Sequence, residues 1–411
     1  MSVREICLRA KENSQAIATA DESIMNKMLQ ASANALRQKA DYIIEENKKD
    51  IISCTREKQF IDRLMLDKKR IESISVGLEK LMDLTCPVGE ILEERILYNG
   101  LHLQRIRVPL GVLGIIYEAR PNVTADAIGL AIKSGNAVVL RGSKDAYQSN
   151  RAITTTIKEA ITNLGVNADF IQLIDDTSRD GAKELMRMNG LIDVLIPRGS
   201  ASLIQNALQN ATVPIIETGT GNCHIYFESS ADIDKAIPIL INAKTQRTSV
   251  CNACESLLLD ESFAQKHLFD IVAALQEKNV DIVACENCRK IIPELAPASE
   301  EDFYAEFLSL KISIKIINGV DEAINWINRF STHHSDAIIT ENARVAEAFL
   351  NGVDSAAVYW NASTRFTDGF EFGLGAEMGI STQKLHARGP MGLKELTSYK
   401  YLVRGNGQIR G

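Results

Sequence analysis

The residue whose type and surroundings best suit covalent chemistry is Cys251. It follows a stretch of small and polar residues, 244–250, and precedes the apolar run 257–259. A cysteine in such a setting is accessible to a substrate, and Arg247 lies four residues ahead of it. A nearby fixed positive charge lowers the pKa of a thiol and so raises the fraction of nucleophilic thiolate. The pattern predicts a catalytic nucleophile, with an incidental thiol at the start of a helix as the alternative.

Two pairs of cysteines have the Cys-x-x-Cys spacing of zinc and redox sites: Cys251 with Cys254, and Cys285 with Cys288. The gap between the pairs exceeds the roughly 15–20 residues of a zinc ribbon, and neither pair carries the glycines of a metal knuckle. We therefore predict no metal site and keep a zinc-binding or redox-sensing interaction protein as the rival class. A reversible disulfide between Cys251 and Cys254 under oxidation is a further hypothesis.

Composition narrows the class of protein. The chain has 411 residues, 45% of them hydrophobic and 24% charged, with a formal charge of −7. That length exceeds what one core usually organises, so two domains are expected. The acidic balance argues against a nucleic-acid partner. The N-terminus does not read as a signal peptide and no apolar run approaches about 18 residues, so we expect a cytoplasmic protein with reduced thiols and no membrane partner.

Periodicity in the first third of the chain changes from helical to extended. Apolar residues recur at three- and four-residue steps and predict amphipathic helices over about ninety residues: Met25, Met28, Leu29, Leu36, Ala40 and Ile43. Residues 95–108 then alternate with a period of two around Asn99-Gly100, which predicts a β-hairpin. A lone hairpin is marginally stable, so it should pack on another part of the chain or on a second subunit.

From Gly111 onward, short apolar runs alternate with helical segments, which is typical of parallel βαβ units. We predict strands at 112–117, 137–140, 170–174, 192–196 and 213–217. Ligands bind beyond the carboxyl ends of such strands, where this chain has the polar segments 118–124, 141–144, 197–200 and 217–222. The common Gly-x-Gly-x-x-Gly dinucleotide motif is absent. A second α/β region should begin after Asn222, and residues 361–411 look too polar for core and suggest a binding loop followed by a terminal arm.

Several long motifs, in order, resemble the γ-glutamyl phosphate reductase family of the aldehyde dehydrogenase superfamily. They cover nearly the whole chain: EARPNVT at 118–124, GNAVVLRG at 135–142, ETGTGNCH at 217–224, QRTSVCN at 246–252, HHSDAII at 333–339, NASTRFTDG at 361–369 and FGLGAEMGISTQKLHARGP at 372–390.

The resemblance implies an α/β fold of aldehyde dehydrogenase type and a homo-oligomer. Its parts would be a doubly wound parallel-sheet cofactor domain, an α/β catalytic domain and a small β oligomerisation module. We expect the cofactor domain at 1–92 and 112–221, and the catalytic domain at 222–381. The oligomerisation hairpin and C-terminal arm would span 93–111 and 382–411.

The implied reaction is the NADPH-dependent reduction of L-glutamate 5-phosphate to L-glutamate 5-semialdehyde and phosphate, the second step of proline biosynthesis from glutamate. The Cys251 thiolate would attack the acyl phosphate and form a thioester, which accepts a hydride. An NAD(P)-dependent aldehyde oxidiser using the same cysteine is the alternative. Because no segment looks like a kinase, the phosphorylating step belongs to another chain, and a transient complex with glutamate 5-kinase is a candidate partnership.

Three further residues take catalytic or cofactor roles by resemblance. The Asn122 amide and the Cys251 backbone N–H would stabilise the oxyanion. Glu217 resembles the glutamate that activates water in aldehyde oxidation. The usual Leu-Gly-Gly after it is Thr-Gly-Thr at 218–220, so Glu217 could instead orient groups or tune Cys251. Glu306 resembles the glutamate that holds the nicotinamide ribose, although the usual Gly-Pro that follows is replaced by Leu308-Ser309.

The same resemblance implies a set of anion-binding residues. Arg141 stands where many relatives carry a lysine, and a guanidinium suits a 2′-phosphate, which favours NADPH. Further cofactor contacts are expected from Ser143, Lys144, Gly199 and Ser200. For the substrate anions the candidates are Arg120, Arg247 and Arg365, with ordinary surface ion pairs as the alternative.

Overall fold

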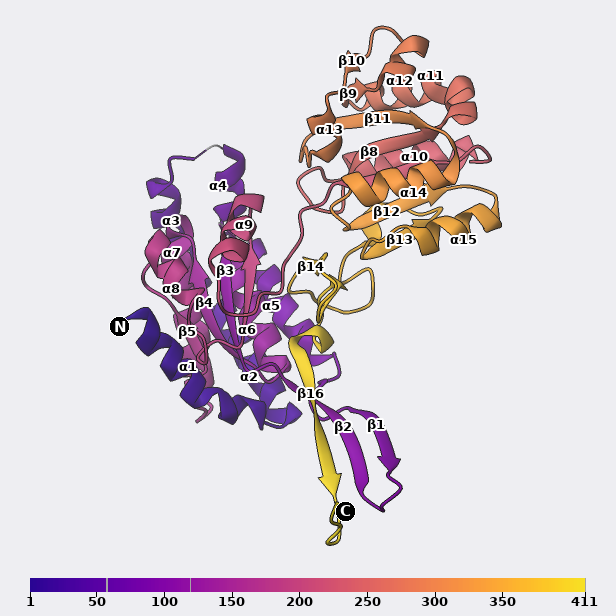
Figure 1. The fold of residues 1–411 in the computed structure, drawn as a ribbon. Helices are drawn as coiled ribbons and strands as arrows, with labels where there is room; N and C mark the ends of the chain where they lie inside the picture. Colours follow the sequence, from indigo (N-terminus) through magenta and orange to yellow (C-terminus); the bar gives the residue numbers. More distant parts are fainter. Residues whose placement is uncertain (57, 119, 411) are drawn as a thin grey trace. The chain divides into compact units, whose positions relative to one another are not determined.

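The computed structural model of the chain describes residues 1–56, 58–118 and 120–410. It forms two compact units, each described here by itself. Unit 1 contains residues 1–218, 373–379 and 391–411, and unit 2 contains residues 219–372 and 380–390 (Figure 1). Within the described residues, no helix combines the length and apolarity needed to cross a membrane.

Unit 1 opens with the helical layer that the periodicity predicts. Its helices are α1 (Val3–Ala18), α2 (Glu22–Gln38), α3 (Ala40–Ser53), α4 (Lys58–Leu64) and α5 (Lys68–Met82). The apolar stripe of α2 is buried, including Met25, Met28 and Leu29, which confirms the amphipathic pattern. Helix starts carry the expected caps, since Ser2 and Glu5 form a capping box and the Asp21 side chain caps α2.

The parallel sheet of unit 1 has the order β5-β4-β3-β6. Its strands are β3 (Val112–Tyr117), β4 (Ala137–Gly142), β5 (Ile171–Leu173) and β6 (Val194–Arg198), joined by α6 (Asn122–Lys133), α7 (Tyr147–Thr162) and α8 (Arg179–Leu185) and followed by α9 (Ala201–Asn210). The chain runs outward from β3 to β4 and β5, and then returns to the other side of β3. This reversal makes the sheet doubly wound, as predicted.

The predicted strand at 213–217 is wrong. Only Ile215 forms a β-bridge, with Leu195, so the segment adds no full strand to the sheet. Pro214 accepts a hydrogen bond from the Leu195 N–H at 2.8 Å but has no N–H of its own to donate. The apolar residues of the segment do pack in the core, since Val213 and Ile216 are buried. The proline nevertheless interrupts the hydrogen-bond ladder that a strand would need.

A three-stranded antiparallel sheet of order β1-β2-β16 completes unit 1. Strands β1 (Ile91–Ile96) and β2 (His102–Pro109) form the predicted hairpin, and Gly100 takes a positive φ of 82° in its turn. The hairpin packs on β16 (Thr397–Arg404), a strand of the same chain. The expectation that residues 361–411 are too polar for the core is wrong in part, because Met391 and Leu396 are fully buried.

Unit 2 is built on a seven-stranded parallel sheet of order β10-β9-β11-β8-β7-β12-β13. The strands are β7 (Cys223–Phe227), β8 (Cys254–Asp260), β9 (Asp281–Ala284), β10 (Ala296–Pro297), β11 (Lys311–Ile317), β12 (Ser335–Ile339) and β13 (Ala357–Trp360). Its helices are α10 (Ile233–Thr245), α11 (Glu261–Glu277), α12 (Glu286–Ile291), α13 (Glu300–Tyr304), α14 (Gly319–Phe330) and α15 (Ala343–Gly352). The short strands β14 (Ile380–Ser381) and β15 (Gly389–Pro390) pair with each other.

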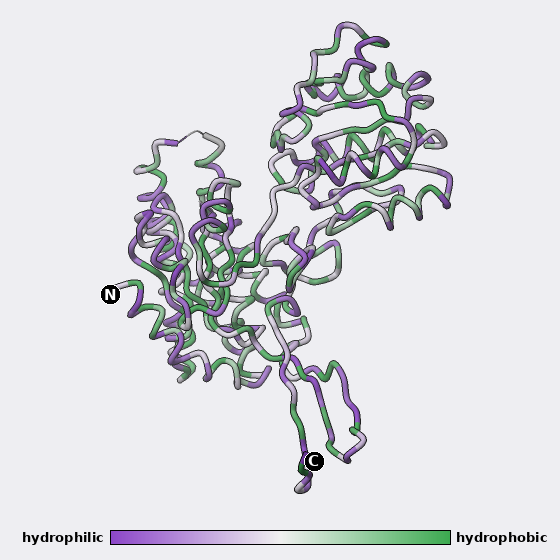
Figure 2. Tube along the Cα trace, viewed as in Figure 1, coloured by the Kyte–Doolittle hydropathy of each residue, from purple (hydrophilic) through white to green (hydrophobic). Residues whose placement is uncertain are grey.

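Alternate residues of these strands fill two cores, one on each face of the sheet. Ile225 and Phe227 of β7 belong to the core that contains residues of α10 and α11. Tyr226 lies between them in sequence and points to the other core, where its ring stacks on Phe349 of α15 at 6.2 Å. Figure 2 shows hydrophobic colouring along the strands and mixed colouring along the helices. Burying each such side chain contributes about 1.5–3 kcal/mol and holds the strand ends that carry the polar residues in place.

Candidate active site

Cys251 lies in the turn between α10 and β8 and is partly exposed. The Cys223 thiol donates a hydrogen bond to the backbone carbonyl of Cys251 at 3.2 Å. Gly221 packs so closely that a Cβ added there would lie 1.4 Å from the same carbonyl oxygen. The backbone of the proposed nucleophile is thus held against the segment that enters β7, and only a glycine fits opposite it.

A second segment of unit 2 is tied to this turn through Asn252. The Asn252 Nδ2 donates to the carbonyl oxygens of Arg365 at 3.3 Å and Thr367 at 2.8 Å. The Thr364 hydroxyl returns a hydrogen bond to the Asn252 carbonyl at 2.8 Å. These three bonds hold the 3₁₀ turn η2 (Thr364–Phe366) beside the residue that follows Cys251.

The arrangement brings two of the predicted anion-binding arginines to the same place. Burial lowers the pKa of Arg365, the neighbouring Arg247 lowers it further, and Cys251 contributes in the opposite direction. Arg365 Nε donates to Gln246 Oε1 at 2.9 Å, while Arg247 is exposed. Two guanidinium groups therefore lie within electrostatic range of one another beside Cys251, a setting suited to an anionic substrate.

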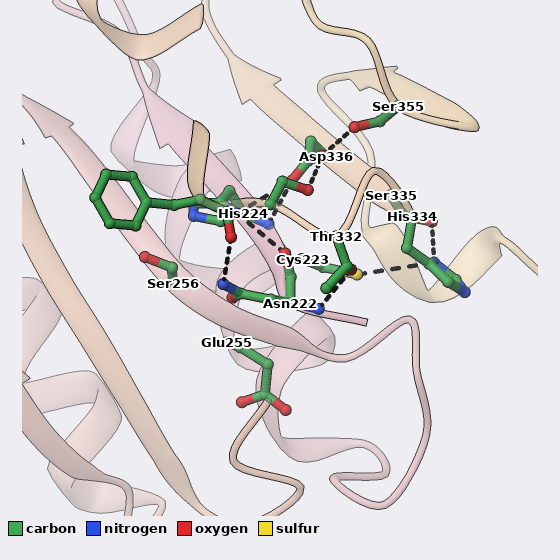
Figure 3. Close-up of polar contacts among 12 residues, drawn as sticks. Asn222, Cys223, His224, Glu255, Ser256, Thr332, His334, Ser335, Asp336 and Ser355 are labelled. Carbon is green, nitrogen blue, oxygen red and sulfur yellow. Dashed lines mark hydrogen bonds and ion pairs between the residues drawn. The ribbon is translucent and has the colours of Figure 1, made fainter. Parts of the chain in front are cut away.

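A buried polar network surrounds Cys223 (Figure 3). Asp336, at 0% exposure, accepts from the His224 backbone N–H at 2.7 Å and from the hydroxyls of Ser331 at 2.9 Å and Ser355 at 2.5 Å. A buried carboxylate that accepts from several fixed donors in this way is held rigidly. The network therefore fixes the first residues of β7 relative to β12.

His334 lies on the other side of Cys223. Its Nδ1 is 3.9 Å from the Cys223 sulfur and 2.8 Å from the Ser335 hydroxyl. Complete burial lowers the pKa of His334 to about 4, so the ring is neutral at physiological pH. Sequence reasoning missed Cys223, His334 and Asp336 as contributors, although all three lie inside the motifs at 217–224 and 333–339.

Glu306 reaches the same turn from the segment after α13. Its Oε1 accepts from the Gly221 backbone N–H at 2.7 Å, and burial raises its pKa. The structure thus brings Glu306, Arg247 and Arg365 together with Cys251 in unit 2. Contact of Glu306 with a nicotinamide ribose stays a prediction.

Cys254 is separated from solvent although it follows Cys251 by three residues. It begins β8, is fully buried, and donates to the Ser256 carbonyl at 3.5 Å. Burial raises the pKa of this thiol to about 12, so little thiolate forms at neutral pH. Its burial disfavours a disulfide with Cys251.

In unit 1, Asn122 begins α6 directly after the turn that follows β3. Its Nδ2 donates to Asp126 Oδ2 at 3.0 Å, which orients the amide. Partial removal of Asp126 from solvent raises the pKa of this carboxyl to about 6. The predicted role of Asn122 as an oxyanion donor is a proposal, and the Asp126 contact shows what holds its side chain.

Several of the predicted cofactor-binding residues lie at the carboxyl end of β4. Arg141 Nη2 donates to the carbonyls of Thr177 at 2.6 Å and Ser178 at 2.5 Å, and burial lowers its pKa. Its Nε and the Ser143 hydroxyl are buried and have no hydrogen-bond partner in the described part of the chain. Lys144 is exposed at the start of η1 (Lys144–Ala146). Unsatisfied buried polar groups next to an exposed cation fit an anionic cofactor group.

The turn between β6 and α9 carries Gly199 and Ser200. Ser200 donates to the Glu118 carboxylate from its backbone N–H at 2.8 Å and from its hydroxyl at 3.1 Å. A Cβ on Gly199 would lie 2.7 Å from the same carboxylate, so a larger residue there would require the Glu118 side chain to shift. Any anionic cofactor group that binds here must displace Glu118. Arg120 is partly exposed in the segment between β3 and α6, and its backbone N–H donates to the Glu118 carbonyl.

Glu217 lies near the end of the first segment of unit 1. It is partly buried, and desolvation raises its pKa, which increases its capacity to act as a proton acceptor near neutral pH. The next residue, Thr218, donates from its hydroxyl to the Pro197 carbonyl at 2.6 Å. Among the described residues, no group of three or more His, Cys, Asp or Glu side chains is arranged to hold a metal ion.

The chain is similar in sequence to known proteins of one family. The model of the aldehyde dehydrogenase family matches residues 2–286. The gamma-glutamyl phosphate reductase of Caldanaerobacter subterraneus subsp. tengcongensis is 50% identical, with 100% of both chains covered. That of Clostridium botulinum is 53% identical over 98% of both chains.

Solved structures give the same family. The crystal structure of gamma-glutamyl phosphate reductase from Thermotoga maritima superposes with a TM-score of 0.98 at 43% identity and covers 100% of both chains. An acetylating aldehyde dehydrogenase from Geobacillus thermoglucosidasius shares the fold, with a TM-score of 0.71 at 19% identity over 100% of this chain and 97% of its own. The chain therefore belongs to the aldehyde dehydrogenase family and, within it, to the gamma-glutamyl phosphate reductases.

Proposed function

We propose that this chain reduces L-glutamate 5-phosphate to L-glutamate 5-semialdehyde and phosphate with NADPH, as the second step of proline biosynthesis from glutamate. The observation that carries the proposal is full-length similarity, at about 50% identity, to relatives of that name. The turn that presents Cys251 beside Arg247 and Arg365 supports it, because the substrate is an anion that a nucleophile must attack.

The chemistry divides into two steps at Cys251. The thiolate attacks the acyl phosphate carbonyl, phosphate leaves with the electron pair of its C–O bond, and a thioester remains on the sulfur. A bound nicotinamide would supply the hydride for reduction of this thioester; the C–S bond would then break, which releases the aldehyde and restores the Cys251 thiolate. Phosphate is a good leaving group, so the chain must supply position and charge rather than a strong acid.

The remaining residues take the roles that this chemistry needs. The Asn122 amide, oriented by Asp126, and the Cys251 backbone N–H stabilise the developing oxyanion. Arg247, Arg365 and Arg120 bind the substrate's phosphate and carboxylate. Water would waste the thioester, so Glu217 orients groups or tunes Cys251 in this reaction and would activate water only in an aldehyde oxidiser.

For the cofactor, Arg141 and Ser143 would hold the 2′-phosphate of NADPH with their unpartnered polar atoms, assisted by Lys144. Gly199 and Ser200 would contact the cofactor after displacement of Glu118, and Glu306 would hold the nicotinamide ribose. Replacement of Arg141 by Ala should lower the kcat/KM ratio of NADP⁺ to NAD⁺ by about 10–100-fold, since a charge-assisted bond to phosphate contributes about 1.5–3 kcal/mol. An unchanged ratio would remove Arg141 from the cofactor site.

The reverse reaction tests the activity. We expect reduction of NADP⁺ by glutamate 5-semialdehyde to require both phosphate and Cys251, so that Cys251→Ser loses at least about 10³-fold in kcat. Omission of phosphate is the matched control. Turnover without phosphate that is lost in Glu217→Gln would instead identify a hydrolytic aldehyde dehydrogenase with Glu217 as the water activator.

The assembly is part of the same proposal. Residues 1–92 and 112–221 would form the cofactor domain and 222–381 the catalytic domain, while the hairpin 93–111 and the arm 382–411 would join subunits of a cytoplasmic homo-oligomer. Removal of residues 397–411 should then reduce the mass measured by light scattering to that of a smaller species. A transient complex with glutamate 5-kinase would deliver the labile acyl phosphate, and a faster coupled rate when both enzymes are present would support it.

A further inference from the structure

The second Cys-x-x-Cys pair, which the proposed reaction does not use, lies where β9 passes into α12. Cys285 is partly exposed and Cys288 is fully buried in the core of unit 2. The two sulfurs lie 3.6 Å apart, within hydrogen-bonding distance of each other. A disulfide has an S–S distance of about 2.05 Å, so an approach of about 1.5 Å would join them.

The backbone around Cys285 favours a negatively charged sulfur. The Cys285 carbonyl accepts from the Arg289 N–H at 3.1 Å in α12. The Cys285 sulfur accepts from the Ile316 N–H of β11 at 3.4 Å. The Cys288 thiol and then the backbone N–H groups of Ile316, Cys288 and Asn287 lower the pKa of Cys285 to about 5, against the effect of burial.

Cys288 has the opposite character. The hydrogen bond to Cys285 and burial raise its pKa, and its sulfur lies 3.8 Å from the Ile314 carbonyl. Cys285 is therefore the partly exposed thiol with the lowered pKa, and Cys288 is the enclosed thiol with the raised pKa. This asymmetry is what distinguishes an attacking cysteine from a resolving cysteine in thiol–disulfide exchange.

We propose that Cys285 and Cys288 form a redox-active dithiol site that reacts with small-molecule disulfides such as glutathione disulfide. The Cys285 thiolate attacks one sulfur of the disulfide, forms a mixed disulfide and releases the first small thiolate. Cys288 then gives up its proton and attacks Cys285 Sγ, and the second small thiolate leaves. Two protein thiols are oxidised to one internal disulfide, and the small disulfide is reduced to two thiols.

The test uses the full-length protein treated with glutathione disulfide, quenched with acid, alkylated and mapped by peptide mass spectrometry. Wild type should contain a Cys285–Cys288 disulfide and little glutathione adduct. Cys288→Ser should trap the adduct on Cys285 at about tenfold or greater excess over wild type, because the resolving step is removed. Cys285→Ser should leave Cys288 unmodified.

Cys54→Ser is the matched control, because it removes a partly exposed thiol from unit 1 and should form the disulfide as wild type does. Absence of the disulfide in wild type, where no substitution affects folding, would overturn the proposal. So would a Cys288→Ser protein, shown to be folded by circular dichroism, that carries adducts on Cys54 but none on Cys285. Stoichiometric zinc in purified wild type that is lost in Cys285→Ser would replace the redox site with a metal site.

Discussion

The thiol of Cys223 donates a hydrogen bond to the backbone carbonyl of Cys251 at 3.2 Å. Cys223 is itself fully buried between the Asp336 network and His334, so its sulfur has little freedom. The position of the nucleophile's backbone is consequently coupled to the packing of β7 against β12 rather than to the turn alone.

This relationship predicts a positioning role for Cys223. In Cys223→Ala the donor is lost, and we expect a fall in kcat of about tenfold with a loss of about 1 kcal/mol of stability. Cys223→Ser keeps a donor and should recover most of kcat. Steady-state kinetics and thermal unfolding measure both effects. If the serine and alanine variants have the same kcat, the hydrogen bond does not position Cys251.

Gly221 provides a steric test of the same turn. A Cβ at this position would lie 1.4 Å from the Cys251 carbonyl oxygen, which is backbone and cannot rotate away. Gly221→Ala should therefore lower kcat by at least about tenfold and cost about 1–3 kcal/mol of stability, as for other overpacked sites.

Gly77 is the matched control for Gly221. It lies inside α5, and a Cβ there would meet nothing within 4 Å. Gly77→Ala should keep full activity and add about 0.5–1 kcal/mol of stability, because alanine favours the helix. Equal kcat values in the two glycine variants would show that the close approach at Gly221 does not matter for catalysis.

The raised pKa of Asp126 predicts that the stability of the folded chain depends on pH. Its pKa is about 6 in the folded chain, against about 3.9 for an unfolded aspartate. Because the pKa is raised on folding, the stabilisation from the protonated Asp126 carboxyl is fully present below pH 4. It is lost as pH rises through 6 and the carboxyl ionises. Asp126→Asn should thus be more stable than wild type by about 1–2 kcal/mol at pH 8 and about equal to it at pH 4, measured by chemical unfolding.

Two substitutions of Asp126 distinguish the effect of its charge from its role in orienting Asn122. The amide introduced by Asp126→Asn retains an acceptor oxygen for Asn122, so this variant should keep most of kcat, whereas Asp126→Ala removes the contact that orients the Asn122 side chain. We expect the alanine variant to lose about tenfold in kcat with little change in the KM for cofactor. An alanine variant with full kcat would mean that Asn122 is oriented by other groups.

Lys244 and Glu255 form an ion pair whose side chains are both 0% exposed. Glu255 also accepts from the Leu308 N–H at 3.2 Å, and burial raises the pKa of its carboxyl to about 7. Lys244→Met leaves the carboxyl without its cation and should cost about 3–5 kcal/mol. Lys244 lowers the pKa of Glu255 against the effect of burial, so its removal should raise that pKa above 7, and the stability deficit should grow as pH rises above 7.

The double variant Lys244→Met with Glu255→Gln controls for the loss of the pair. It removes both charges while retaining an acceptor for Leu308, so most of the stability should return and its pH dependence should disappear. Unfolding midpoints at pH 6 and 8.5 would show this. A double variant as unstable as the single one would assign the loss to packing of the Lys244 side chain.

Local patterns predicted most of the elements for identifiable reasons. Segments 112–117 and 137–140 are apolar runs that follow the positive-φ glycines Gly111 and Gly135, and they form β3 and β4. The segment at 213–217 has the same apolar pattern, yet Pro214 removes a ladder donor and only a bridge forms. Met391 and Leu396 lie in a polar stretch of sequence, so local pattern does not indicate that both are buried.

The sequence alone determined the nucleophile candidate and the family, because residue types and the order of motifs are properties of the sequence itself. Only the tertiary structure revealed that Cys223 and Asp336 hold the site and that Glu118 occupies the turn of Gly199 and Ser200. These contacts join positions separated in sequence by 28 residues for Cys223 and Cys251, and by 112 for His224 and Asp336. Such pairs meet only when parallel strands pack in register, and that register is a property of the whole sheet rather than of any local pattern.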